Sequence, residues 1–386
     1  MPTSCLPPEL WLQVFHWATN YSQNTFSTTY EPFSNSPFVE EHQVLRVKHS
    51  LALVCRTWHA LSKEFLYRDV RIGPAQTSLK EALCTPEESA KFVRRVVLPF
   101  QSTTTPTYSS SPLTSVEILK LCPQVEVLVR PRLLAPSTLQ TPRDAPRFEF
   151  DVDSLSLPSL KRLEWNFLPE AERTGGINSL TDVLLHSPNI EYLHIGGFNP
   201  RSQIPPGHSQ IHLPKLNTIS MSSLTAHVIH QLCYRWTLPA LSHLIVGSVN
   251  LPTISTLWER YASQLESVEL GRHLAFLQRD FVGPCVRSCP NLKELNYHVF
   301  FTLPPDFAGE SGSIETIGLH AGRNEMLPPE SDAAWALLLS HLDSLLGGAL
   351  PLLRDIRLHG DWSVFLADGR ITSRLYGGGY NIYVCS

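Results

Sequence analysis

The sequence of 386 residues has few charged side chains and no long apolar run. Charged residues make up 17% of the chain, and 31 Lys and Arg stand against 35 Asp and Glu, a formal net charge of −4. Nucleic acids and anionic membranes need concentrated positive charge, so this balance argues against both as the main partner. No run of about 18 or more apolar residues occurs, and we expect no transmembrane helix.

Paired cysteines are also lacking. The 8 cysteines are scattered singly, only Cys285 and Cys289 are near neighbours, and no C-x-x-C motif occurs. The stretch from Met1 to Trp17 has no basic region followed by the apolar run of a secretory signal. We therefore expect reduced thiols in a cytoplasmic and/or nuclear protein, with no metal site and no cofactor.

The motifs of common enzymes are absent as well. There is no G-x-x-x-x-G-K-[ST] phosphate loop, and the nearest approach to a G-x-S-x-G elbow, Gly309 to Ser313, lacks the final glycine. His227 and His230 lack the spacing and the glutamate of an H-E-x-x-H zinc motif, so ordinary helix histidines are the simpler interpretation. These absences predict a non-catalytic protein without catalytic residues.

What the chain does have is an internal repeat, within a sequence that is 42% hydrophobic and holds 31 prolines. The template is an apolar residue, two variable residues, an apolar residue, one variable residue and another apolar residue. Its clear copies are Leu160, Leu163, Trp165; Ile190, Leu193, Ile195; Leu216, Ile219, Met221; Leu241, Leu244, Val246; Leu265, Val268, Leu270; Leu292, Leu295, Tyr297; Ile314, Ile317, Leu319; and Leu353, Ile356, Leu358.

Five of the seven steps between these copies fall within the roughly 20–29 residues of leucine-rich repeats. A proline usually stands two residues before the triplet, as Pro188 and Pro239 do, and often follows a helical stretch. Proline ends a helix, so the predicted unit is helix, proline turn and short strand. An amphipathic helix is the alternative, but the last two triplet positions alternate as in a strand.

The N-terminal region has a different pattern, that of short helices interrupted by a polar insert. Leu6 to Leu10 reads LPPEL and opens an amphipathic stretch, and helical spacing resumes in LALVCRTWHAL, from Leu51 to Leu61. Between them, Thr19 to Lys48 is rich in Ser, Thr, Asn and Pro. We expect this insert to be a mobile surface loop that is dispensable for folding.

These two segments resemble the F-box of the large fungal (basidiomycete-like) families, and V-C-[KR]-x-W is their most telling part. The resemblance implies a Skp-type adaptor as partner and, through it, a cullin scaffold. By the same resemblance the adaptor contacts fall on Leu6, Pro7, Leu10, Phe15, Leu53, Val54, Cys55 and Trp58. Leu53 and Trp58 also suit a small helical core. The insert of about 30 residues adds only about 1–2 kcal/mol of loop-closure cost, but could cover the adaptor face.

The predicted fold is thus α/β: a small helical F-box at 1–72 with the inserted loop at 19–48, an irregular leucine-rich-repeat-like solenoid at 73–360, and a C-terminal hairpin or cap at 361–386. Asp368-Gly369 suggests the hairpin turn. The implied function is substrate recognition in a ubiquitin ligase, with an unknown protein as substrate. The alternative is a leucine-rich-repeat interaction scaffold outside any ligase.

Substrate recognition is expected on the strand face of the C-terminal repeats. Residues beside the triplets point away from the core because side chains alternate along a strand. Three histidines recur there on successive strands, too far apart to share one zinc. The predicted substrate-binding residues are Glu269, His298, His320, Arg357 and His359, with a solvated surface as the alternative.

Overall fold

The computed structural model describes residues 6–19, 25–34, 41–72, 76–84, 89–98, 115–131, 155–167, 172, 175–197, 210–222, 226–247, 251–272, 277, 279–307, 312–328 and 331–385. The chain forms two compact units. Unit 1 comprises Met1–Thr28, Asn35–Leu193 and Ile211–Leu213. Unit 2 comprises Thr29–Ser34, His194–Gln210 and Pro214–Ser386, so part of the N-terminal insert belongs with the C-terminal repeats.

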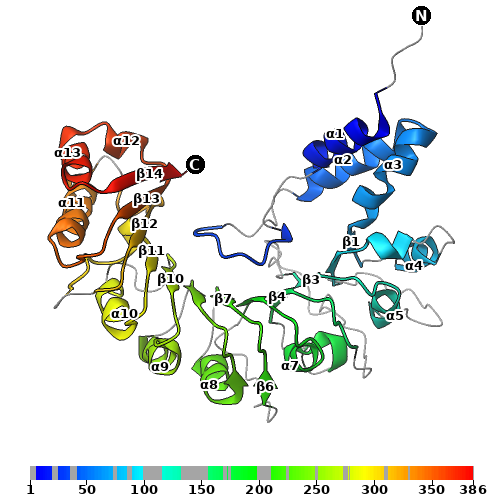
Figure 1. The fold of residues 1–386 in the computed structure, drawn as a ribbon, viewed down its shortest axis with the longest axis horizontal. Helices are drawn as coiled ribbons and strands as arrows, with labels where there is room; N and C mark the ends of the chain where they lie inside the picture. The colour runs from blue at the N-terminus through cyan, green and yellow to red at the C-terminus, as the bar shows by residue number, and fades with distance from the viewer. Residues whose placement is uncertain are drawn as a thin grey trace, which may run out of the picture. The chain divides into compact units, whose positions relative to one another are not determined.

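A parallel sheet of 12 strands runs through the chain in nearly sequential order (Figure 1). Its strands are β1 (Asp69–Arg71), β2 (Arg95–Val97), β3 (Val127–Arg130), β4 (Arg162–Asn166), β5 (Tyr192–Gly196), β7 (Thr218–Met221), β9 (His243–Val246), β10 (Ser267–Leu270), β11 (Glu294–His298), β12 (Thr316–Ala321), β13 (Asp355–Gly360) and β14 (Asn381–Cys385). Two shorter strands are β6 (Ile211–His212) and β8 (Trp236–Thr237). The fold is a mixed α/β arrangement consistent with a solenoid of leucine-rich-repeat type.

The predicted repeat is confirmed as a repeat of buried side chains. Every residue of the eight clear triplets is at most 7% exposed. The middle residues are register partners across neighbouring strands, as Val268, Leu295 and Ile317 show. Because these triplets are in register on neighbouring strands, the apolar core of unit 2 continues from repeat to repeat.

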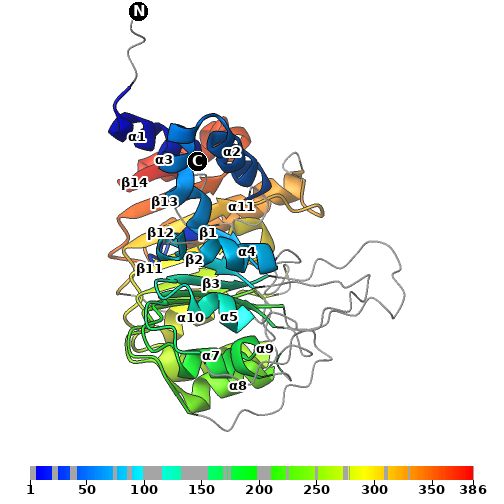
Figure 2. The same ribbon diagram turned by 90° about the vertical axis from the view of Figure 1, so that its right-hand side faces the viewer.

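Helices connect the strands in both units. Unit 1 holds α1 (Pro8–Thr19), α2 (Glu41–Leu53), α3 (Arg56–Tyr67), α4 (Gln76–Leu83), α5 (Ser115–Lys120) and α7 (Leu180–Leu185). Unit 2 holds α8 (Ala226–Arg235), α9 (Leu251–Tyr261), α10 (Val282–Ser288), α11 (Asp332–Leu346), α12 (Ser363–Leu366) and α13 (Gly369–Gly377). Short 3₁₀ turns are Ser89–Phe92, Gly176–Asn178 and Val299–Phe301. Helices α8, α9 and α10 lie on the same side of their strands (Figures 1 and 2).

The surface loop predicted for residues 19–48 is wrong at both ends of that range, and its residues 20–24 and 35–40 lie outside the described residues. Thr19 ends α1, and α2 already begins at Glu41. Within the described residues 25–34, the Phe26 ring is partly buried against Val97, Val127 and Val129 in unit 1. The polar composition of this segment predicts exposure, but its aromatic side chains pack against residues far along the chain.

Of the hairpin or cap predicted for residues 361–386, the hairpin around Asp368-Gly369 is wrong. Asp368 caps α13, its carboxylate accepting a hydrogen bond from the Arg370 N–H at 2.8 Å, and Gly369 is the first helical residue. Asp is favoured both at helix N-caps and in turns, so the Asp-Gly pair alone could not distinguish the two. After α13, β14 pairs with β13 in parallel.

Candidate functional site

The candidate site lies on the side of the unit 2 strands opposite the helices α8–α10 (Figure 1). One row of register partners on this side consists of Glu269 in β10, Asn296 in β11, Gly318 in β12 and Arg357 in β13. These residues alternate with the buried triplets along each strand, so they face away from the apolar core. We call this row, together with the histidines described next, the polar face.

A second row of the polar face consists of three histidines. His298, His320 and His359 are register partners, and the ring centroids of His298 and His320 lie 4.5 Å apart. Alternation along the strands therefore brings together all five residues predicted to bind substrate, namely Glu269, His298, His320, Arg357 and His359.

Residues 29–34 of the insert lie on the polar face, where sequence reasoning placed a substrate. The Tyr30 ring stacks on His243, with centroids 5.2 Å apart and planes 9° from parallel. Its hydroxyl accepts a hydrogen bond from Asn296 Nδ2 at 2.7 Å, between residues 266 positions apart. Asn296 is fully buried.

Phe33 makes the second set of contacts. Its backbone N–H donates to Glu269 Oε2 at 2.8 Å, and its ring centroid lies 5.1, 4.9 and 4.9 Å from the rings of the three histidines. A Cβ atom added at Gly318 would collide with the Asn296 side chain and lie 3.4 Å from the Phe33 ring. Glycine at 318 therefore leaves the space that Asn296 and Phe33 use.

The electrostatics of the polar face favour uncharged groups. Burial raises the pKa of the Glu269 carboxyl to about 7 and the pKa of the Tyr30 hydroxyl well above its usual value. Burial lowers the pKa of His320 to about 4 and also lowers the pKa of His359. Near neutral pH these two imidazoles are neutral, which suits contact with an aromatic ring.

Arg357 is held by an acidic partner on the same face. Its Nη1 donates to Glu294 Oε1 at 3.3 Å, and the same oxygen accepts from Asn296 Nδ2 at 3.0 Å. The guanidinium is thus engaged with Glu294, while Glu269 accepts hydrogen bonds from the Phe33 backbone N–H and, at 3.5 Å, from the Tyr30 hydroxyl. Sequence reasoning missed Glu294, Tyr30 and Phe33, because contacts over such separations leave no local signal.

The residues assigned to an adaptor lie in unit 1 and divide into exposed and packed groups. Leu10, Val14 and Trp17 follow an i, i+4, i+7 spacing on α1 and are 43%, 39% and 75% exposed. Leu53 at the end of α2 and Val54 after it are 75% and 58% exposed. We call these five side chains the apolar set. Leu6, Pro7 and Cys55 are exposed too.

Phe15 and Trp58 instead hold α1 and α3 together. Phe15 is fully buried, and its ring lies 4.9 Å from Trp58 and 6.3 Å from Phe65. Trp58 is half-buried and also contacts Trp11 at 4.6 Å. Cys55 caps α3, its sulfur accepting from the Trp58 N–H at 3.4 Å. Val14 and Trp17 were absent from the predicted adaptor contacts, although their helical spacing was readable.

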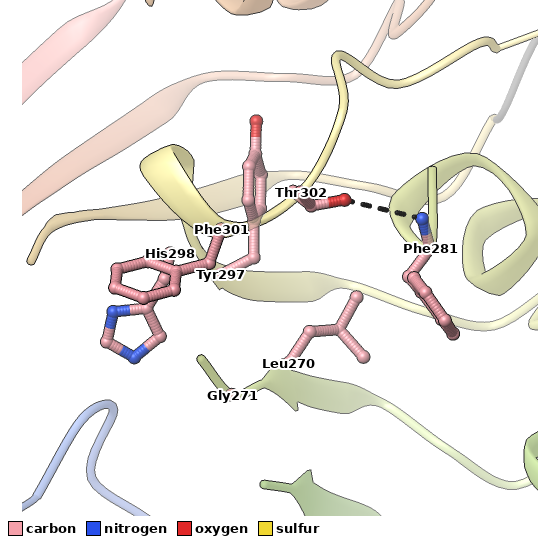
Figure 3. Close-up of a pocket in the computed structure, with 7 residues that line it drawn as sticks. All are labelled: Leu270, Gly271, Phe281, Tyr297, His298, Phe301 and Thr302. Atoms are coloured by element: carbon pink, nitrogen blue, oxygen red, sulfur yellow. Dashed lines mark hydrogen bonds between the residues drawn. The ribbon is translucent and has the colours of Figure 1, made fainter. Parts of the chain in front are cut away.

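Two cavities in unit 2 differ in size. The one in Figure 3 lies between β10, β11 and α10 and has a volume of about 10 Å³, room for about one water. Phe281 and Thr302 line it and are joined by a 3.5 Å hydrogen bond (Figure 3). A more open cavity of about 370 Å³ lies between Phe300, Arg323 and Val364, without a nucleophile paired to a base in its lining.

Groups that could bind a metal are not assembled within the described residues. Three or more His, Cys, Asp or Glu side chains do not meet there in a metal-binding group. Cys285 and Cys289 are both buried, and the neighbouring Cys289 together with burial raises the pKa of the Cys285 thiol. His230 lies against Tyr234, with ring centroids 4.4 Å apart.

Comparisons with known proteins add little. No protein-family model and no curated protein matches the chain. A chain in the crystal structure of a TLR13–ssRNA13 complex is similar at a TM-score of 0.36 and 15% identity, with 72% of this chain and 41% of that chain covered. This chain spans less than half of that one, and so low a TM-score carries no argument. Among the described residues, no helix is long and apolar enough to cross a membrane.

Proposed function

We propose that this chain is the substrate-recognition subunit of a Skp–cullin–F-box ubiquitin ligase of the fungal type. In this proposal, the helices α1–α3 bind a Skp-type adaptor, and the repeats bind a protein substrate. The observation that carries the first part is the apolar set, because Leu10, Leu53 and Val54 belong to the two F-box-like segments and are exposed. Leu10, Val14 and Trp17 share one face of α1, and large exposed apolar side chains on one face mark a protein interface.

The division between exposed and packed residues refines the roles. Leu10, Val14 and Trp17 form the stripe that an adaptor would cover, and Phe15 supports α1 from behind it. Truncation of Phe15 would therefore test folding rather than contact. The stripe is the better target.

The test is adaptor binding by the full chain carrying Leu10→Ala and Trp17→Ala. If both side chains are interface anchors, each contributes about 1–3 kcal/mol, and affinity falls by roughly 30-fold or more. Titration with a purified Skp-type adaptor measures this loss. The matched control is Leu185→Ala, since Leu185 on α7 of the same unit is 45% exposed; it should bind as the unchanged chain does.

Equal adaptor binding by a folded double variant would remove the apolar set as the interface. If the unchanged chain, folded by circular dichroism, captures no Skp-type adaptor at all, the ligase proposal fails. The leucine-rich-repeat scaffold would then be the function to pursue.

A further inference from the structure

The segment on the polar face is a short turn that holds a phenylalanine in an unfavourable conformation. The Ser34 N–H donates to the Glu31 carbonyl at 3.4 Å, with Pro32 and Phe33 at the two central positions. Phe33 has a φ of 56°, and type II turns favour Gly or Asn at such a position. A left-handed conformation costs a residue with a side chain roughly 1–2 kcal/mol.

The polar face is built around this turn and is not fully satisfied by it. Asn296 is fully buried and Glu269 is 8% exposed, and each bonds to the segment. Within the described residues, Asn296 Oδ1, His320 Nδ1 and His359 Nε2 nevertheless have no hydrogen-bond partner. Buried polar atoms without partners are costly, so they weaken the docking of residues 29–34 and favour its displacement.

We propose that the polar face is a peptide-binding site for a turn of the form Tyr-x-Pro-Phe, and that Tyr30 to Phe33 occupies it as an internal ligand. A protein partner presenting an aromatic, any residue, proline and a second aromatic displaces the internal segment. This inference rests on the proposed function in one respect, since it names the class of substrate that the repeats would take.

Each position of the motif has a reason in the contacts. The first aromatic stacks on His243, and its hydroxyl accepts from Asn296. Any residue is allowed at the second position of the motif, because the Glu31 side chain is exposed. The third position of the motif is Pro32, and proline is favoured there because it is the second residue of the four-residue turn. The last aromatic enters the space between the three histidine rings, with its backbone N–H on Glu269.

The test is direct binding of a labelled peptide, Thr-Tyr-Glu-Pro-Phe-Ser, which is the sequence of residues 29–34. The unchanged full chain should bind it weakly, because its own segment competes. The variant carrying Tyr30→Ala and Phe33→Ala should bind it about tenfold tighter or more, because the polar face is uncovered in a larger fraction of the molecules. Fluorescence anisotropy measures both affinities, and a Tyr376→Ala variant, altered at an exposed tyrosine of α13, serves as control.

Changes in the peptide test the motif without perturbing the fold of the protein. Replacing the peptide tyrosine by phenylalanine removes only the hydroxyl that Asn296 would bond and should weaken binding by about fivefold. Replacing the peptide phenylalanine by alanine should abolish detectable binding. Equal binding of all three peptides would overturn the motif.

A second measurement serves if the double variant does not fold. In the unchanged chain, saturating peptide should speed hydrogen exchange at the Phe33 amide, which is released from Glu269. An exchange rate of the Phe33 amide that does not change at saturating peptide would overturn the internal-ligand proposal. So would protection of this amide that depends on protein concentration, because the segment would then bind the polar face of a second chain. No adaptor is present in these assays, so their failure is distinguishable from failure of adaptor binding.

Discussion

At the scale of single residues, the buried environment of Glu269 disfavours the charge of its carboxylate. Its carboxyl is 8% exposed, and burial, with a smaller contribution from Glu294, raises its pKa to about 7. The hydrogen bonds from Phe33 and Tyr30 act in the opposite direction without offsetting burial. When residues 29–34 leave the polar face, Glu269 is exposed and returns towards its ordinary pKa.

Docking of residues 29–34 should therefore weaken as the pH rises. The covered carboxyl has the higher pKa, so its contribution is fully present below the ordinary value of 4.5 and is lost as the pH rises through about 7. That difference corresponds to at most about 3 kcal/mol. The protection factor of the Phe33 amide, corrected for intrinsic exchange, measures docking. In the unchanged chain this factor should fall between about pH 5 and 8, and Glu269→Gln should remove that fall.

His320 imposes the opposite trend and supplies the control. Burial, then His359 and Arg272, lowers its pKa to about 4, so its contribution is present above the ordinary value of 6.5 and is lost as the pH falls through about 4. His298 and Phe33 face the same ring. Glu269→Gln should keep this acid-side loss. If the protection factor of the Phe33 amide in the Glu269→Gln variant still falls between about pH 5 and 8 as in the unchanged chain, Glu269 is not the titrating group.

At the scale of elements, the first two strands of the sheet are joined by a buried ion pair. Asp69 in β1 and Arg95 in β2 are register partners, and Arg95 Nη1 donates to both Asp69 carboxylate oxygens at 2.9 Å. The Arg95 side chain is fully buried and that of Asp69 is 21% exposed. A buried guanidinium that loses its carboxylate partner is strongly destabilising.

Asp69→Asn should lower the free energy of unfolding of unit 1 by about 3 kcal/mol. Chemical denaturation, followed by far-ultraviolet circular dichroism, measures the change. The comparison is Glu117→Gln, which removes an exposed ion pair with Lys80 at 3.4 Å and should cost less than about 1 kcal/mol. Equal losses in the two variants would show that burial of Arg95 is not the source of the effect.

The strands and their cores could be predicted from sequence because the signal is local. Triplets such as Leu265, Val268 and Leu270 combine alternation with a preceding turn, and a strand follows from those few residues. The same alternation placed Glu269 and His320 on one face. Sheet register then needed only the repeat spacing.

Other elements depend on information that short patterns do not carry. The Asp368-Gly369 pair fits a hairpin turn and a helix start equally well, and the packing of α13 decides between them. Residues 29–34 have no periodicity at all. Their place on the polar face depends on contacts such as that of Phe33 with Glu269, 236 positions away, which spacing cannot reveal.

At the scale of the whole molecule, the insert contributes to each unit separately. In unit 1, Phe26 packs beside Val97, with the Arg68 guanidinium 4.4 Å from its ring. Thr28 Oγ1 donates to Glu191 Oε2 at 2.8 Å in the same unit. In unit 2, Tyr30 and Phe33 cover the polar face. The two parts of the insert should therefore differ in what their removal does.

Replacing Thr29–Ser34 by Gly and Ser residues of equal number should leave both units folded. The triplet core of unit 2 lies on the other side of its strands, and the stability of a solenoid comes mainly from its repeats and the contacts between neighbouring repeats. The lost burial of Tyr30 and Phe33 is partly offset by release of the left-handed Phe33 backbone. The free energy of unfolding of unit 2 should therefore fall by about 1–3 kcal/mol. Denaturant titration measures this change. Phe26→Ala is the comparison and should destabilise unit 1, with the polar face unaffected. A replaced chain that lacks a cooperative transition would mean that the segment is part of the structural core of unit 2 and not a ligand of it.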